Sequence, residues 1–242
     1  MNTERLLAQG LGGWLQYEFA CHRSGLFNER YLAVPISQVL NSVYGLPVHS
    51  EYVHPVLARD LTGPGRRPEV DFVVVDPGGK IRCVVESKWC GANGLAAEHV
   101  IWDLLRLELV AEDTGADAYF ILAGRKSHLL AFFETKAFKG SEHDGRYRRL
   151  LKLDSRKNPR LRVDSPPPDR LSALKKVLLP YSTVDFPSRV STSLCQVYPN
   201  DVPKYQYQAY AWKVFAPPGT PRFKPGDNKT YSPEPPSGGA AA

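Results

Sequence analysis

The stretch EVDFVVVDPGGKIRCVVESK, residues 69–88, contains two β-rich runs separated by a strong turn signal. β-Branched and other apolar residues dominate the runs 70–75 and 80–88, and Asp-Pro-Gly-Gly stands between them at 76–79. This arrangement is typical of a β-hairpin. We therefore expect two adjacent antiparallel strands at the centre of the fold.

The length of the turn decides which side chains share a face of this hairpin. A two- or four-residue turn places Asp71 opposite Val84, one diagonal step from Glu86, and Lys88 lies on the same face because side chains alternate along a strand. A three-residue turn would move Asp71 to the other face. The predicted cluster of two acids and one lysine therefore depends on the turn.

Apolar residues occupy both faces of the predicted strands, so both faces should be buried. The acid-bearing face carries Val73, Val75 and Val84, and the other carries Val70, Phe72, Val74, Ile81, Cys83 and Val85. Charged groups at the end of a buried hairpin are costly unless they are paired or bind a metal. A structural ion pair of Lys88 with either acid is the alternative interpretation.

Two adjacent carboxylates repel each other, and a hard divalent cation removes that conflict. Magnesium takes oxygen ligands, usually one or two carboxylates with waters and substrate phosphates. We expect Asp71 and Glu86 to hold Mg²⁺, for which Mn²⁺ can substitute. Lys88 would then place a positive charge near the attacking water or the reacting phosphate.

The residues Arg66-Arg67-Pro68-Glu69-Val70-Asp71, followed by Val84-Val85-Glu86-Ser87-Lys88, resemble the motif of the PD-(D/E)xK nuclease superfamily. Asp71 matches the first acid of that motif, Glu86 the second acid and Lys88 the lysine. One departure is that two residues separate Pro68 from Asp71. The resemblance covers about 100 of the 242 residues.

The resemblance implies an α/β fold with a central mixed β-sheet flanked by helices, a restriction-endonuclease-like core with a C-terminal β/loop extension. It also implies a further glutamate on the helix before the first strand, where Glu29 is the preferred match. Glu18, one helix earlier, and Glu51, on the first strand itself, are the alternatives. On the helix after the lysine, Asp103 and Arg106 are three residues apart, and we expect them to form a structural pair.

Positive charge is concentrated in one segment. Residues 136–162 hold ten Lys or Arg and three acids, a balance of +7 against +6 for the whole chain. Such a segment suits a phosphate backbone, although a solvated loop is an equal alternative. The residues expected to contact nucleic acid are Arg146, Arg148, Arg149, Lys152, Arg156 and Lys157.

The expected organisation is an N-terminal helical extension at 1–27, a nuclease core at 28–135, a basic segment with a C-terminal extension at 136–216, and a disordered tail at 217–242. Four separated cysteines indicate reduced thiols and a cytoplasmic protein. The sequence has no apolar run long enough to predict a membrane span. The aromatic stretch 205–215 could stack on bases, but packing as an edge strand is favoured.

These patterns predict a Mg²⁺-dependent endonuclease that hydrolyses DNA, with RNA left open as a substrate. By family analogy the setting is restriction or anti-phage defence, and the active form is a homodimer or part of a larger defence complex. The alternative is a catalytically weak or inactive nuclease-fold module for nucleic-acid binding or assembly. No phosphate-binding GxxxxGK[ST] motif is present, which argues against a nucleotide-driven motor.

Overall fold

A computed structural model describes residues 2–61, 69–143, 146–147, 149–153 and 160–231. Its centre is a mixed sheet in the order β1-β2-β3-β4-β11-β9-β7, with β10 also paired to β11. The pair β3–β4 is parallel, whereas the other pairs of this sheet are antiparallel. The strands are β1 (Val48–Val53), β2 (Glu69–Val75), β3 (Ile81–Cys90), β4 (Asp117–Arg125), β7 (Arg160–Arg162), β9 (Arg189–Thr192), β10 (Gln196–Tyr198) and β11 (Tyr207–Phe215).

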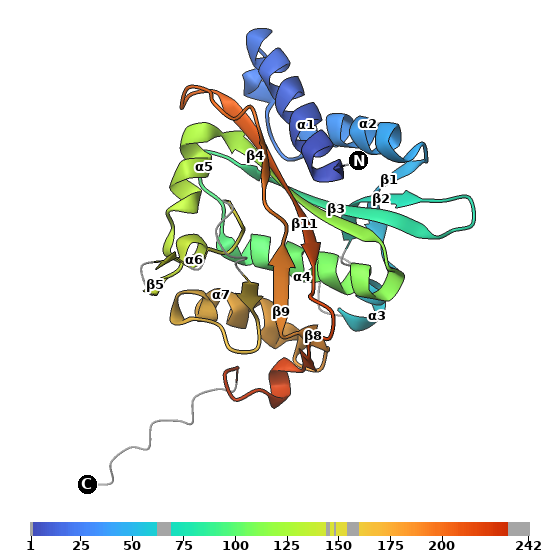
Figure 1. Cartoon of the computed structure of the whole chain (residues 1–242), viewed down its shortest axis with the longest axis vertical. Helices are drawn as coiled ribbons and strands as arrows, with labels where there is room; N and C mark the ends of the chain where they lie inside the picture. The colour runs from blue at the N-terminus through green and yellow to red at the C-terminus, as the bar shows by residue number, and fades with distance from the viewer. Residues whose placement is uncertain (1, 62–68, 144–145, 148, 154–159, 232–242) are drawn as a thin grey trace.

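Helices cover both faces of the sheet, which confirms the predicted fold class (Figure 1). One face packs against α1 (Thr3–Ala20) and α2 (Ala33–Tyr44), joined through the short turns η1 (Ser24–Leu26) and η2 (Arg30–Leu32). The other face packs against α4 (Ala97–Thr114). α3 (Pro55–Asp60) and α7 (Pro168–Leu178) pack against α4, and η3 (Leu179–Tyr181) follows α7. α5 (Lys126–Phe133) packs against β3 and β4, and α6 (Lys136–Lys139) lies between α5 and α7.

The second helix begins later than its apolar spacing predicts. Apolar spacing in the sequence predicts a helix over 28–42, but η2 comes first and α2 begins at Ala33. Pro35 lies in the first turn of α2, where a backbone N–H has no intrahelical partner, so the proline does not break the helix. Gly45 ends α2 in the left-handed conformation with φ of 63°, as its position predicts.

The hairpin forms as expected, but the observed strand register differs from the predicted one by two residues. The backbone N–H of Asp76 bonds the Lys80 carbonyl, which encloses a three-residue turn and shifts the register by one. A bulge beyond Val75 shifts it again, so that Phe72 pairs with Val85. Phe72 is the last residue of β2 in this pairing, and Asp71, just before it in the chain, accepts hydrogen bonds from Ser87 on β3. The second shift cancels the change of face caused by the first.

Two side chains of the hairpin, Ile81 and Val70, face the opposite side of the sheet from the one predicted. Val73 and Val84 pack on the α4 side, as expected, but Ile81 joins them there, because the extra residue reverses the alternation near the turn. Val70 also lies in the α4-side core, next to the point where β1–β2 pairing skips Asp71. Phe72, Val74, Cys83 and Val85 face α1 and α2, as predicted.

Both predicted extensions contact the central sheet. β11, from the C-terminal extension, pairs with β4 along eight residues, and α1 packs across it. The residue types at 189–198 predict one strand, but the segment is divided into β9 and β10, which pair with different parts of β11. β11 is therefore an interior strand, and the predicted edge position of the aromatic stretch is wrong.

The predicted start of the disordered tail at residue 217 is too early in the chain, because ordered structure continues beyond it. Residues 222–223 form β12 (Arg222–Phe223), which pairs with β8 (Phe186–Pro187), and η4 (Pro225–Asp227) follows. Tyr231 is almost fully buried and packs against Phe223. These contacts explain why the Pro- and Gly-rich composition does not prevent order up to this residue. Residues 232–242 lie outside the described part of the chain.

A buried ion pair ties this C-terminal part to α4. Glu108 on α4 is 1% exposed, and its Oε1 lies 3.2 Å from Nη1 of Arg222. Burial raises the pKa of Glu108 to about 7, although Arg222 opposes the shift. The folded protein therefore binds a proton at Glu108 in a pH range where the unfolded chain, with an ordinary pKa of 4.5, does not.

The pKa of Glu108 predicts a pH-dependent stability. Protonated Glu108 contributes fully to the free energy of unfolding below about pH 4.5. This contribution is lost as pH rises through 7, because ionisation of Glu108 costs more in the folded state than in the unfolded chain. We expect Glu108→Gln to gain about 2–3 kcal/mol relative to the native chain between pH 5 and pH 8. Urea unfolding at both pH values measures this difference. A difference independent of pH would contradict the prediction.

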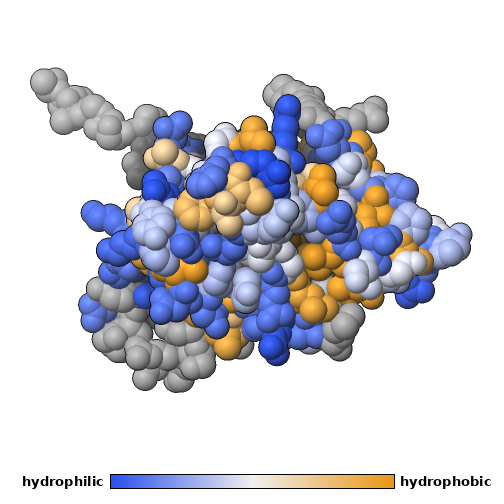
Figure 2. Space-filling view, turned by 90° about the horizontal axis from the view of Figure 1, so that it is seen from above, coloured by the Kyte–Doolittle hydropathy of each residue, from blue (hydrophilic) through white to orange (hydrophobic). Residues whose placement is uncertain are grey.

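Figure 2 shows the face seen from above Figure 1, where hydrophilic residues cover much of the surface and apolar residues gather in separate patches. No helix in the described part of the chain combines the length and the apolar character needed to cross a membrane.

Candidate functional site

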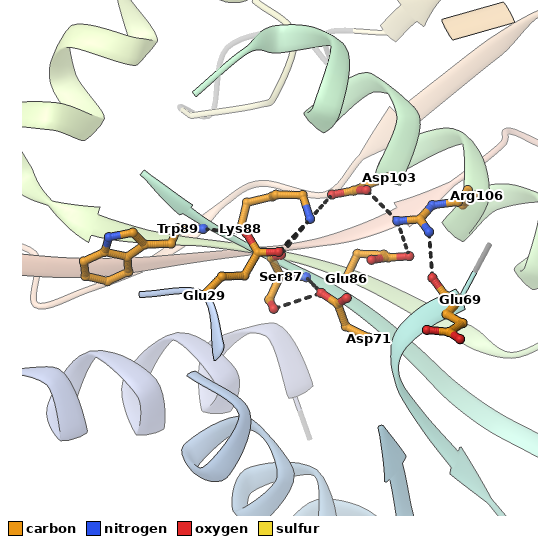
Figure 3. Close-up of polar contacts among 9 residues, drawn as sticks. All are labelled: Glu29, Glu69, Asp71, Glu86, Ser87, Lys88, Trp89, Asp103 and Arg106. Carbon is orange, nitrogen blue, oxygen red and sulfur yellow. Dashed lines mark hydrogen bonds and ion pairs between the residues drawn. The ribbon is translucent and has the colours of Figure 1, made fainter. Parts of the chain in front are cut away.

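Six charged side chains from four parts of the chain meet where β3 passes beneath α4 (Figure 3). Asp71 comes from β2, Glu86 and Lys88 from β3, and two more residues from α4. Glu29, from the loop before η2, reaches the other five from the α1–α2 layer. We call this group the charged cluster: Glu29, Asp71, Glu86, Lys88, Asp103 and Arg106.

Glu86 is the most deeply buried member of the charged cluster. Its side chain is 0% exposed, and Oε1 lies 2.9 Å from Nη2 of Arg106. That contact lacks hydrogen-bond geometry, and neither oxygen of Glu86 accepts a hydrogen bond from a residue that the structure describes. Burial, followed by the charge of Asp103, raises the pKa of Glu86 well above its usual range, and Asp71 adds to the shift. Two buried acceptor oxygens thus lack a hydrogen-bond donor.

Lys88 is held between carboxylates from both layers. Its Nζ lies 3.1 Å from Oε1 of Glu29 and 3.2 Å from Oδ2 of Asp103, and it donates to the Ser87 carbonyl at 3.2 Å. Burial alone would lower the pKa of Lys88, but the surrounding acids, led by Asp103, raise it overall. Lys88 therefore stays protonated at neutral pH and provides a fixed positive charge.

Asp103 and Arg106 form the pair predicted from their spacing, with Oδ1 of Asp103 2.7 Å from Nη2 of Arg106. Arg106 also donates from Nη1 to the Glu69 carbonyl at 2.6 Å. Sequence reasoning placed this pair outside the site, whereas Asp103 contacts Lys88 and Arg106 contacts Glu86. The i, i+3 spacing revealed the pair, but only tertiary packing revealed what the pair contacts.

Asp71 contacts β3 through the residue between the other two motif positions. Its Oδ2 accepts from the backbone N–H of Ser87 at 2.8 Å and from the Ser87 hydroxyl at 3.0 Å. Alternation along β3 predicts that the Ser87 side chain points to the face opposite that of Glu86 and Lys88. It gives no sign that Ser87 contacts Asp71. Figure 3 shows the Asp71 carboxylate near that of Glu86, and the charge of Asp71 contributes to the raised pKa of Glu86. The structure thus brings Asp71, Glu86 and Lys88 into one cluster.

Among the three candidate glutamates, Glu29 reaches the charged cluster. It contacts Lys88, and its Oε2 lies 3.5 Å from the backbone nitrogen of Trp89. Glu18 instead binds Arg23 at 2.6 and 2.5 Å and Tyr31 at 2.7 Å, so it is part of the packing between α1 and the following loop. Glu51 is exposed on β1, with φ of 50°.

The predicted nucleic-acid-binding segment is described only in part. Arg148, Arg156 and Lys157 lie outside the described residues, and Arg146 belongs to the two-residue strand β6 (Arg146–Tyr147), which pairs with β5 (Glu142–His143). Arg149 and Lys152 are half-buried. Leu150 and Leu151, between them, are buried in the α4-side core. This part of the segment is therefore packed, and the alternative of a wholly solvated loop is wrong for it.

The donor set suits a hard cation that keeps water ligands. Within the described ranges, no group of three or more His, Cys, Asp or Glu residues could enclose a metal. Asp71 and Glu86 provide two carboxylates, and magnesium commonly binds to one or two carboxylates plus waters and phosphate oxygens. With four acids and two bases, the charged cluster has a formal charge of −2 when fully ionised. A divalent cation would balance that charge.

Comparisons with protein-family models, curated proteins and solved structures found no match to this chain.

Proposed function

We propose that this chain is a magnesium-dependent endonuclease that hydrolyses DNA phosphodiester bonds at the charged cluster. The observation that carries the proposal is Glu86, a fully buried carboxylate beside Asp71 with two oxygens that lack hydrogen-bond donors. A buried acid is expected to have such donors when its role is purely structural. A cation held by Asp71 and Glu86 would compensate for their absence.

The residues of the charged cluster have complementary roles in this reaction. When bound, Mg²⁺ supplies a Lewis acid that polarises the phosphate and lowers the pKa of a water. Asp71 on β2 and Glu86 on β3 would hold it. Lys88 places its ammonium beside the charge that develops on the phosphate.

Asp103 would act as a positioning residue for Lys88. Its carboxylate contacts both Lys88 and Arg106, so it fixes a lysine whose flexible side chain has many other conformations. Glu29 contacts the same Nζ from the opposite layer, and it could add a ligand to the bound ion. The basic segment near Arg149 and Lys152 would provide the phosphate contacts that bring DNA to the site.

The inactive-module alternative has one observation in its favour. Arg106 already neutralises part of the charge of Glu86 and Asp103, and Lys88 is engaged by two acids. A network of this kind could stabilise the fold without binding a metal. The two functions differ in whether DNA is cut.

Incubating supercoiled plasmid with the protein and Mg²⁺ tests the proposal. We expect nicked and linear products, which EDTA abolishes. Lys88→Met should lower the cleavage rate by about 100- to 1,000-fold, the usual effect of removing one charge-stabilising donor. Lys80→Met, which changes an exposed lysine at the turn of the same hairpin, is the matched control. Binding of DNA without cleavage under all conditions would favour the inactive module.

A further inference from the structure

Four aromatic rings form a continuous row that ends beside the charged cluster. Tyr205, Phe19, Tyr207 and Trp89 have successive ring-centroid distances of 6.3, 5.6 and 5.8 Å. Trp89 and Tyr207 are stacked, with 24° between their planes. We call these residues the aromatic row. They come from the loop before β11, from α1, from β11 and from β3.

The sheet explains how Trp89 and Tyr207 meet across an intervening strand. Trp89 on β3 pairs with Ala123 on β4, and Ala123 pairs with Ala209 on β11. Small side chains at both positions leave room above β4 for the two rings. Phe27, which is 9% exposed, packs edge-on against Tyr207 at 4.7 Å and contacts Trp89 at 5.9 Å.

The aromatic row remains accessible to solvent, although β11, which provides Tyr207, also carries an aromatic residue that is completely buried. Trp212 on β11 is fully buried in the α4-side core. By contrast, Tyr205 is 52% exposed, and Phe19, Tyr207 and Trp89 are only partly buried. Packing alone does not account for a line of partly exposed rings, and exposed apolar patches commonly mark binding surfaces.

One residue connects the aromatic row to the charged cluster. Glu29 contacts Nζ of Lys88 at 3.1 Å and approaches the backbone nitrogen of Trp89 at 3.5 Å. Figure 3 shows Trp89 next to Lys88, with its ring directed away from the carboxylates. A strand whose phosphate lies at Lys88 would therefore have its neighbouring bases close to Trp89.

Cationic side chains lie beside the exposed end of the aromatic row. Lys204 is exposed and precedes Tyr205, and Arg125 donates from Nε to the Tyr205 carbonyl at 3.0 Å. Aromatic rings beside positive charge are the combination that binds single-stranded nucleic acid, because bases stack on the rings and phosphates contact the cations.

We propose that the aromatic row binds unpaired bases of single-stranded DNA next to the charged cluster. The inference deepens the proposed function, on which it rests for the choice of DNA, by making the substrate a strand with unpaired bases rather than an intact duplex. Every base has a face that can stack on an aromatic ring, so this surface would contribute little sequence preference.

Fluorescence anisotropy with labelled DNA oligonucleotides tests this inference. With EDTA present to prevent cleavage, we expect the full chain to bind a single strand more tightly than the duplex of the same sequence. Tyr205→Ala and Trp89→Leu should each weaken single-strand binding about 10-fold, the effect of losing one stacked base. Tyr17→Ala changes a 63% exposed tyrosine of α1 outside the aromatic row and should leave binding unchanged.

The outcomes separate this inference from the proposed nuclease activity. Unchanged single-strand binding by Tyr205→Ala, or duplex binding as tight as single-strand binding, would overturn the inference. Tyr205 is exposed, so its loss should not unfold the protein even if Trp89→Leu does. Because the assay contains chelator, a chain that binds single strands through the aromatic row but never cuts plasmid would support the inference and refute the nuclease.

Discussion

Glu86→Gln is expected to reduce magnesium-dependent cleavage by at least about 100- to 1,000-fold while leaving the fold intact. The amide keeps the shape of the side chain but removes the negative charge that would hold the cation with Asp71. Arg106 retains Asp103 and the Glu69 carbonyl as partners, so no buried guanidinium is left without a counter-charge. Cleavage rates at several Mg²⁺ concentrations, together with urea unfolding, measure both effects.

The stability measurement decides between two roles of Glu86. A neutral side chain avoids the cost of a buried charge, so we expect the free energy of unfolding in chelator to stay within about 1 kcal/mol of the native value. Glu112→Gln, which changes an exposed glutamate of α4, controls for loss of charge and should cut normally. Wild-type cleavage by a folded Glu86→Gln protein would eliminate Glu86 as a metal ligand.

Arg106→Met is expected to give the largest loss of stability within the charged cluster. Without the guanidinium, Glu86 and Asp103 keep their burial but lose the cation between them, which typically costs about 3–5 kcal/mol. Arg82→Met breaks an exposed arginine–carboxylate contact with Asp76 on the same hairpin and should cost at most about 1 kcal/mol. Urea unfolding in EDTA compares the two variants.

Magnesium should restore part of the stability that Arg106→Met loses. The substitution changes the formal charge of the cluster from −2 to −3, so a divalent cation binds the folded variant more tightly and stabilises it through linkage. Adding Glu86→Gln to Arg106→Met should recover stability in EDTA and remove the response to magnesium. If magnesium stabilises none of these proteins, Asp71 and Glu86 do not form a metal site.

Local sequence was enough to predict most secondary structure around the site. The sequence predicts a strand at 48–53, which coincides with β1. It also predicts the two hairpin strands and a helix at about 95–112, all within a few residues of the observed bounds. These elements have strong local signals, namely alternating or continuous apolar residues, a Pro-Gly turn and helical spacing. The division of 189–198 into two strands was missed because it depends on pairing with β11.

Local residue patterns account for the hairpin, its apolar burial and the presence of two acids and a lysine near its end. The tertiary structure alone decided that two register shifts cancel, that α4 directs Asp103 and Arg106 at the motif residues, and that Glu29 crosses from the other layer to Lys88. The physical reason is range. Strand and turn preferences act between neighbours in the chain, whereas the charged cluster joins residues up to 77 positions apart, from Glu29 to Arg106, whose approach depends on how both layers pack against the sheet.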